Sequence, residues 1–198
     1  MDRDFYGIYY DRLLATETLM REEVEKMLFS LGSDSETALA EHLKCRIKGA
    51  ESAKEKLLRL GFPVSAESAL TNLSDIIGLR VVTHFVGDIY TVLALIEKDH
   101  AWTVETVKDY IASPKPNGYR SLHVILRLPF GVGGVEFIRT EIQLRTIAMD
   151  CWASLEHQLR YKKNIRNTAL LEEELKRCAD EMASTDLSMQ TIRDMIRQ

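Results

Sequence analysis

Apolar positions along the first third of the chain change spacing, and each change indicates a different element. Helical spacing over residues 4–31 predicts a first helix, and a second helical segment is expected over residues 35–43. Polar and apolar residues then alternate over residues 46–48, which predicts a short strand with both cations on one face. A further helix is expected from Gly49 until Gly61, where a glycine and then a proline stop it.

Beyond residue 78 the pattern favours a sheet, because short runs rich in β-branched residues are separated by turns or by helical spacing. Strands are expected over residues 79–85, 102–107, 121–128 and 135–144. Helices are expected over residues 88–98, 146–162 and 170–197, the last as one helix or a helix pair. The turn predicted between the last two strands is residues 129–134. The fold prediction is therefore α+β, a central mixed β-sheet flanked by helices, with helices at both ends.

The last two predicted strands carry one face that is not an ordinary core face. Alternation places His123 and Arg127 on one side of their strand, and Glu141, Gln143 and Arg145 on one side of the next. A half-solvated antiparallel sheet would also look like this. Donors, a carboxylate and cations side by side are, however, what a phosphate-transfer site needs.

Two connecting segments carry further candidates. In residues 108–120, two prolines and an Asn-Gly pair would hold Lys115, Tyr119 and Arg120 in place, so that the ring could stack on a base while the cations meet phosphates. The alternative is a rigid surface turn. Asp75 and Arg80 flank Gly78 in the second segment, either as a salt-bridged junction or with the carboxylate as a Mg²⁺ ligand.

Composition narrows the function classes. The chain has 198 residues, 45% of them hydrophobic, and a formal net charge of −4, which argues against general nucleic-acid binding. No apolar run reaches the roughly 18 residues of a membrane span, so no membrane partner is expected. The three cysteines form no CxxC pair, which argues against a zinc site and a disulfide framework and favours the cytoplasm.

Several long motifs carry a resemblance to a known family. They are residues 75–80, the run Lys-Asp-Tyr-Ile over 108–111, Lys-Pro-Asn-Gly-Tyr-Arg-Ser-Leu-His over 115–123, and Glu-Ile-Gln-Leu-Arg-Thr over 141–146. In this order they resemble the RelA/SpoT synthetase domain, and most closely the small alarmone synthetases of the RelQ and RelP type. The resemblance implies a nucleotidyltransferase-like synthetase fold over residues 1–165. Residues 166–198 would then be a C-terminal helical extension for oligomerisation.

The resemblance also implies a function. The chain would transfer the β,γ-pyrophosphate of ATP to the 3′-hydroxyl of GDP or GTP, giving ppGpp or pppGpp and AMP. The hydrolase domain of the long relatives has no counterpart here, so synthesis without hydrolysis is expected. Mg²⁺ would be the cofactor, held by Asp75 and Glu141, and Glu141 would activate the hydroxyl.

The remaining site residues follow from the same resemblance. The ATP-binding residues would be Arg46, Lys48, Ser52, Lys56, Arg80 and Lys108, with the two arginines enclosing the adenine. The guanine-nucleotide residues would be Lys115, Asn117, Tyr119, His123, Gln143 and Asp150. Thr106, His42 and Lys44 depart from the residues expected in the family at their positions.

Two further hypotheses stay open at the level of sequence. A toxin-like relative would instead pyrophosphorylate the 3′ end of tRNA or an adenine nucleotide. A third hypothesis is a non-catalytic nucleotide-binding module on the same fold. The family resemblance implies a homotetramer, whereas the C-terminal helix could equally be docked on its own domain.

Overall fold

The computed structural model describes residues 2–30, 39–161 and 168–197 of the chain. A five-stranded mixed sheet lies at its centre, in the order β1-β2-β5-β4-β3. The β2–β5 pair is parallel and the other three pairs are antiparallel. The strands are β1 Ala40–Ile47, β2 Ile77–Thr83, β3 Thr103–Asp109, β4 Leu122–Val132 and β5 Val135–Thr146. The mixed sheet with flanking helices confirms the α+β prediction.

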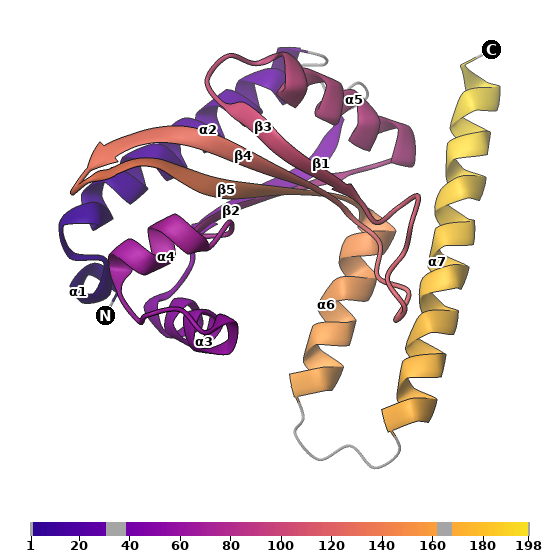
Figure 1. Ribbon diagram of the computed structural model, residues 1–198. Helices are drawn as coiled ribbons and strands as arrows, with labels where there is room; N and C mark the ends of the chain where they lie inside the picture. The colour runs from indigo at the N-terminus through magenta and orange to yellow at the C-terminus, as the bar shows by residue number, and fades with distance from the viewer. Residues whose placement is uncertain (1, 31–38, 162–167, 198) are drawn as a thin grey trace.

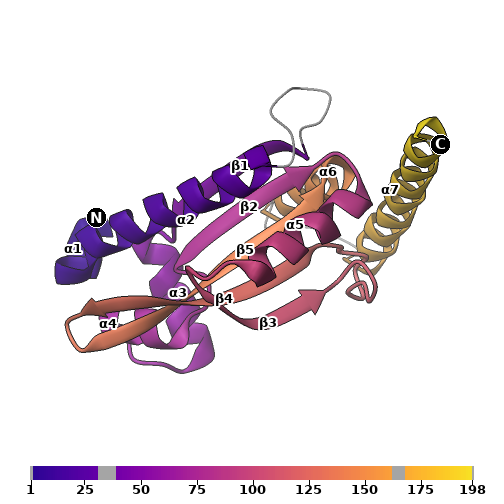
Figure 2. The ribbon, with the colours of Figure 1, turned by 90° about the horizontal axis from the view of Figure 1, so that it is seen from above.

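Two long helices cover the apolar face of this sheet. Helices α2 (Tyr10–Ser30) and α5 (Val86–Lys98) lie side by side above it, as Figures 1 and 2 show. The alternate residues of β4 from Leu122 to Leu128 and their neighbours on β5, Ile142 and Leu144, are at most 2% exposed on this side. Burial of this face is the main apolar contribution to stability.

The polar face is covered in part: Arg127 and Arg139 are exposed, as in a half-solvated sheet, whereas the part of the face that carries His123 and Arg145 is buried. Helices α3 (Ala50–Leu60), α4 (Ala66–Asn72) and α6 (Ile147–Tyr161) lie on this side of the sheet (Figure 1). As a result His123 and Arg145 are only 8% and 5% exposed. Polar groups at such depth need partners, and the site described below supplies them.

The helix expected over residues 35–43 is wrong where the structure describes it. Residues 40–43 belong to β1, and residues 35–38 lie outside the described residues. Leu43, Cys45 and Ile47 alternate with polar residues, so the period-two pattern starts earlier than the short strand predicted over residues 46–48. Leu31 and Lys162, at the expected ends of two other helices, also lie outside the described residues.

Two local features differ from the sequence expectations. Helix α4 was not anticipated, although Ser65 caps it by accepting a hydrogen bond from the Ser68 backbone at 3.0 Å. The turn is shorter than predicted, because β4 and β5 continue through Val132 and Val135 and reverse at Gly133 and Gly134. Both glycines have positive φ, which suits a two-residue hairpin loop.

The C-terminal segment forms one helix, α7 (Thr168–Ile196), that packs on the rest of its own chain. Arg120 pairs with Asp180 at 3.0 Å, and Arg193 pairs with Asp88 at 2.6 Å. Figure 1 shows α7 running beside α6 and past the end of α5. Its outer side still exposes Leu187, Met195 and other large apolar residues, so a role in oligomerisation stays a prediction.

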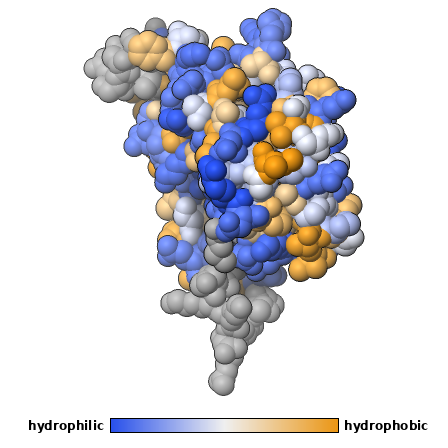
Figure 3. All heavy atoms as spheres, turned by 90° about the vertical axis from the view of Figure 1, so that its left-hand side faces the viewer, coloured by the Kyte–Doolittle hydropathy of each residue, from blue (hydrophilic) through white to orange (hydrophobic). Residues whose placement is uncertain are grey.

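The surface agrees with a folded unit whose apolar residues are mainly inside. Figure 3 shows a mostly hydrophilic face with small hydrophobic groups scattered over it. No helix in the described part of the chain has the length and apolar character needed to cross a membrane.

The contact between α7 and the loop before β4 can be tested at Gly118. This residue has φ +86°, and a Cβ placed there would lie 2.7 Å from Ala179 Cβ. Gly118→Ala is therefore expected to lower the free energy of unfolding by about 2 kcal/mol, from strain and the clash together. Denaturant unfolding measures this change.

Gly134→Ala is the matched control, because Gly134 has nearly the same φ of +84° but no atom within 4 Å of the new Cβ. We expect it to cost only the strain, about 1 kcal/mol. Equal losses in the two variants would mean that the approach of α7 to Gly118 does not contribute.

Candidate active site

Strand register builds a row of polar side chains across the covered face. Lys44 on β1 lies opposite Arg80 on β2, which lies opposite Gln143 on β5. Gln143 in turn lies opposite His123, and His123 opposite Lys108 on β3. Residues opposite one another in a sheet project from the same face, so five strands contribute one residue each to this row.

A cavity of about 170 Å³ lies over this row and the next one. Its lining residues are Lys44, Arg46, Asp75, Gly78, Leu79, Arg80, Glu141 and Gln143. Gly78 lies in register between Arg46 and Glu141, and a Cβ there would meet no atom within 4 Å. The missing side chain therefore leaves open space above the sheet, between the cation and the carboxylate.

Asp75, in the segment before β2, is held by two lysines. Its Oδ2 accepts from Lys48 Nζ at 3.0 Å and from Lys56 Nζ at 2.9 Å. Burial alone would raise the pKa of Asp75, but the hydrogen bonds and charges of the two lysines outweigh it and hold that pKa below its usual value. The carboxylate is therefore ionised at neutral pH.

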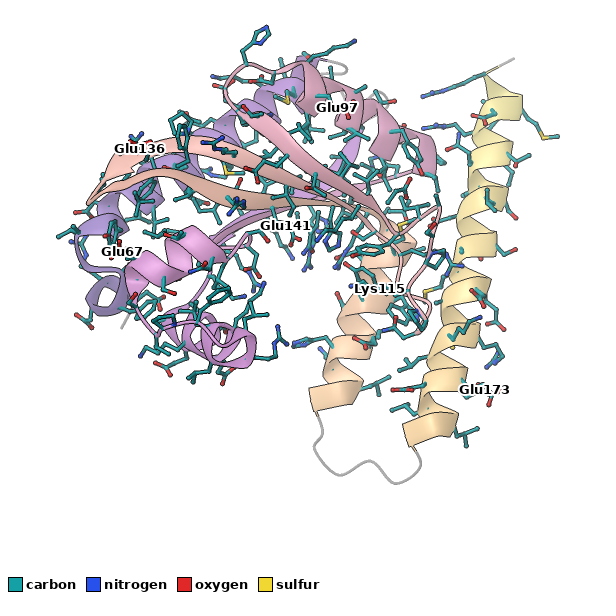
Figure 4. All side chains as sticks on the ribbon, in the orientation of Figure 1. Glu67, Glu97, Lys115, Glu136, Glu141 and Glu173 are labelled. Carbon is teal, nitrogen blue, oxygen red and sulfur yellow. The ribbon has the colours of Figure 1, made fainter. Side chains whose placement is uncertain are left out.

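Glu141 is the second carboxylate of the cavity, and both of its oxygens accept hydrogen bonds. His123 Nδ1 lies 2.9 Å from Oε1, and Gln143 Nε2 donates to Oε2 at 2.7 Å. Burial acts to raise the pKa of Glu141 and the charge on Asp75 adds to that, yet His123 and Gln143 hold the pKa below its usual value. Figure 4 shows Glu141 on the underside of the sheet, toward the space between α4 and α6.

The two carboxylates have the chemistry of a Mg²⁺ site shared with phosphates. Asp75 Oδ1 is buried and has no hydrogen-bond partner, so one lone-pair-bearing oxygen is left for a cation. No group of three or more His, Cys, Asp or Glu that could hold a metal occurs among the described residues. Magnesium suits such a site, because it commonly uses one or two carboxylates together with substrate phosphates and water.

The residues predicted to bind ATP are brought together only in part. Arg46 and Arg80 line the cavity, and Lys48 and Lys56 reach it through Asp75. Two others stand further out. Ser52 is exposed on α3, and Lys108 is exposed on the edge strand β3. Arg80 Nη1 is also paired with Asp150 Oδ1 at 3.1 Å.

Tyr119 is the centre of the predicted guanine side. Its hydroxyl lies 2.8 Å from His123 Nε2, and Lys115 Nζ lies 4.8 Å from the centre of its ring. Asn117 accepts from the Tyr119 backbone N–H at 3.2 Å, so the amide shapes the loop. The loop, held by this hydrogen bond, places the Lys115 cation beside the Tyr119 ring, an arrangement suited to stacking on a base. Figure 4 shows Lys115 in this loop beside α7.

Helix α7 supports this loop from behind. Arg120, which sequence reasoning placed with the site cations, instead donates to Ala179 O at 3.3 Å and pairs with Asp180. Trp152 on α6 donates to Leu175 O at 2.8 Å, and its ring centre lies 6.3 Å from that of Tyr119. The C-terminal helix is thereby part of the wall of the predicted acceptor side.

Sequence reasoning missed two groups that position the cavity. In helix α1 (Asp2–Tyr6), ahead of the short 3₁₀ turn η1 (Gly7–Tyr9), the fully buried Tyr6 donates its hydroxyl to Lys48 O at 2.7 Å. Asp2 accepts from the backbone N–H of Ala50 at 2.8 Å. No local pattern pairs residues more than 40 apart. The second group is Arg145, whose place on the polar face was visible but whose contacts were not.

Two larger cavities lie elsewhere, and neither Asp75 nor Glu141 lines them. One of about 530 Å³ lies between α4 and the β4–β5 hairpin, and one of about 670 Å³ lies between α7 and the body. Phosphate chemistry needs converging cations and a metal-binding pair more than it needs volume. We therefore place the site at the smaller cavity.

Comparison with known proteins identifies the family. The family model described as the region found in RelA and SpoT proteins matches residues 45–166 of this chain. The chain belongs to the RelA/SpoT family. This confirms the family indicated by the sequence motifs, and the matched span includes both carboxylates of the cavity.

Among curated RelA/SpoT relatives, two from Bacillus subtilis (strain 168) are named GTP pyrophosphokinases. YwaC is 44% identical over 141 residues, which is 71% of this chain and 67% of that protein. YjbM is 34% identical over 154 residues, which is 77% of this chain and 72% of that protein.

Solved structures agree. The small alarmone synthetase 1 of Bacillus subtilis, bound to its product pppGpp, superimposes with a TM-score of 0.83 at 27% identity over 99% of this chain and 98% of that one. Small alarmone synthetase 2 of the same organism gives a TM-score of 0.79 at 36% identity over 94% and 98%. The structural likeness to these two synthetases therefore spans nearly the whole chain, beyond the residues that the family model matches.

The hydrogen bond from Tyr6 to Lys48 can be tested in this RelA/SpoT chain. Tyr6→Phe keeps the ring but leaves a carbonyl oxygen without its buried donor, so we expect a loss of about 1–2 kcal/mol in the free energy of unfolding. Urea unfolding measures it. Tyr10→Phe is the control, because Tyr10 is only partly buried, and it should change stability by no more than about 0.5 kcal/mol. A loss no larger than that of the control would contradict the anchoring role.

Proposed function

We propose that this chain is a GTP pyrophosphokinase that makes ppGpp or pppGpp from ATP and GDP or GTP. One observation carries the proposal: Asp75 and Glu141, 66 residues apart in the sequence, line one cavity with Arg46 and Arg80. That arrangement occurs in a RelA/SpoT chain whose relatives YwaC and YjbM carry the same activity in their names.

The reaction is a group transfer with a simple balance of bonds. The 3′-hydroxyl oxygen of the acceptor forms a bond to the β-phosphorus of ATP, and the bond from that phosphorus to the α,β-bridging oxygen breaks. AMP leaves with the electron pair, and the hydroxyl proton goes to Glu141. Such transfers depend mainly on positioning and on neutralising charge.

On the donor side, cations from β1, β2 and α3 hold ATP. Arg46 and Arg80 are on neighbouring strands at the cavity, where planar guanidinium groups can enclose the adenine. Lys48 and Lys56 hold the phosphates as point charges and orient Asp75 through the ion pairs described above. Ser52 on α3 would add a contact at the solvent side, whereas Lys108 lies beyond His123 on the far edge strand β3, so its contact with ATP stays a prediction.

On the acceptor side, the loop from Lys115 to Tyr119 receives the guanine nucleotide. The Tyr119 ring stacks on the base, and Lys115 meets its phosphates. Asn117, His123, Gln143 and Asp150 line the same side. Glu141 accepts the proton of the 3′-hydroxyl, which its lowered pKa permits because the carboxylate is ionised before the substrate arrives.

Asp75 and Glu141 would hold Mg²⁺, which when bound neutralises the phosphate charge that the transfer concentrates. We further propose that the protein is a cytoplasmic homotetramer that makes the alarmone without hydrolysing it, with RNA as the alternative acceptor. The exposed apolar residues Leu187 and Met195 on the outer side of α7 support an oligomer.

The test of this function is product formation. Incubated with ATP, GDP and Mg²⁺, the protein should release AMP and form a guanosine 3′-diphosphate, both read by anion-exchange chromatography. Offering GTP, ATP and tRNA as alternative acceptors in parallel ranks the substrates. Transfer to tRNA alone would replace the proposed function with the toxin-like activity, and nucleotide binding without AMP would replace it with a binding module.

Two isosteric changes test the carboxylates. Glu141→Gln removes the proton acceptor, and Asp75→Asn weakens the metal pair, so each should lower turnover by about 10²–10⁴-fold. Glu136→Gln is the matched control, because Glu136 is an exposed carboxylate on the same strand and should leave turnover unchanged. Turnover near the native rate in either site variant would remove that carboxylate from the mechanism.

A further inference from the structure

Arg145 is a buried cation of the site to which the proposed function gives no role. It follows Glu141 and Gln143 on the same face of β5, and it is 5% exposed. Its Nη1 donates to Asp150 Oδ1 at 3.0 Å. Its Nη2 donates to the Tyr119 hydroxyl at 2.8 Å and to Gln143 Oε1 at 3.1 Å. A single guanidinium therefore holds three of the predicted acceptor-side residues.

These bonds close a ring of five side chains that ends on Glu141. One branch runs from Arg145 through the Tyr119 hydroxyl to His123 Nε2 at 2.8 Å, and from His123 Nδ1 to Glu141 Oε1. The other runs from Arg145 through the Gln143 amide to Glu141 Oε2. Every link has donor–acceptor distances of ordinary or short hydrogen bonds.

Arg145 and the ionised Glu141 together set the direction of every bond in this ring, because a guanidinium can only donate and a carboxylate can only accept. The Tyr119 oxygen receives from it and turns its own proton to His123 Nε2. A neutral His123 then carries its proton on Nδ1 and donates to Glu141. Gln143 is likewise oriented with its oxygen toward Arg145 and its amide N–H toward the carboxylate. Both branches deliver donors to Glu141, which keeps that carboxylate an acceptor.

The same guanidinium joins the two halves of the cavity. Asp150 Oδ1 accepts from Arg145 and also from Arg80 Nη1 at 3.1 Å. Two guanidinium groups thus share one carboxylate oxygen. Burial and the charge of Arg145 lower the pKa of Arg80, which is a sign of how closely the two cations lie.

We propose that Arg145 is a positioning residue for the acceptor half of the site. It contacts neither nucleotide; it fixes the orientation of Tyr119, Gln143 and His123, so that the stacking ring and the Glu141 carboxylate face the acceptor together. This inference rests on the proposed function, because it concerns how the acceptor and the proton-accepting carboxylate are aligned. It also makes a claim about the free protein that needs no turnover.

The conservative variant Arg145→Lys tests the kinetic claim. It keeps a buried positive charge for Asp150, so the fold should survive, but one ammonium cannot replace the planar fork that spans three partners. We expect kcat to fall by about 10²-fold and KM for GDP to rise about tenfold, with KM for ATP changed less than about threefold. Arg139→Lys is the control, because Arg139 projects from the same face of β5 and pairs with Glu105 instead.

A double-variant cycle identifies the partner through which Arg145 acts. Tyr119→Phe removes only the hydroxyl of the first branch, so after that change Arg145→Lys should cost clearly less than it does in the native protein. Fully additive losses, or equal rises in the KM of both nucleotides, would overturn the positioning role. GDP binding measured by calorimetry without ATP should weaken in Arg145→Lys to the same extent as its KM rises.

The tautomer of His123 separates this inference from the proposed function. In ¹⁵N NMR spectra of the full chain, the neutral form of His123 should carry its proton on Nδ1, and His123→Gln identifies the signal by its loss. Arg145→Lys should keep this tautomer, because Glu141 still accepts from Nδ1, but should move the Nε2 signal, because the Tyr119 hydroxyl that donates to Nε2 loses its own donor, whether or not the protein turns over. A proton on Nε2 in the native protein would overturn the proposed ring even if AMP is released, whereas absent AMP with the expected tautomer would overturn only the function.

Discussion

Repulsion between two ionised carboxylates is the constraint around which this molecule is arranged. Asp75 and Glu141 line one small cavity, and the charge on Asp75 opposes ionisation of Glu141. Lys48 and Lys56 offset the charge on Asp75, and His123 with Gln143 stabilises Glu141. Because the cations are already in place, the proposed binding of a metal and two nucleotides would require little reorganisation of the protein, which is the condition under which electrostatic catalysis is effective.

Sheet register is the means by which distant segments meet there. The parallel β2–β5 pair places the strand that follows Asp75 beside the strand that carries Glu141, and α2 and α5 hold the opposite face in the apolar core. The supports come from both ends of the chain. Tyr6 holds the backbone of Lys48, and α7 holds the loop of Tyr119 through Arg120. The chain termini thus stabilise the two halves of the cavity separately.

The strands and the polar face of the sheet were predictable, because both follow from the local spacing of polar and apolar residues. Alternation in residues 121–128 and 135–144 gave the strands and the polar face, and the Glu-Ile-Gln-Leu-Arg-Thr run placed Glu141 on it. What failed depended on partners that are distant in sequence. Residues 40–43 pair with β2 and so became strand, and burial of the polar face came from α4 and α6. Arg145 contacts residues on a loop, a strand and a helix, and no regular spacing in the sequence connects them. Its position on a strand face therefore could not predict these contacts.

Anomalous diffraction from crystals grown with Mn²⁺, GDP and a non-hydrolysable ATP analogue tests the central claim most directly. The account predicts one strong manganese peak within coordination distance of carboxylate oxygens from both Asp75 and Glu141, with phosphate oxygens completing the shell. A peak that contacts neither carboxylate, or nucleotides bound away from this cavity, would contradict it.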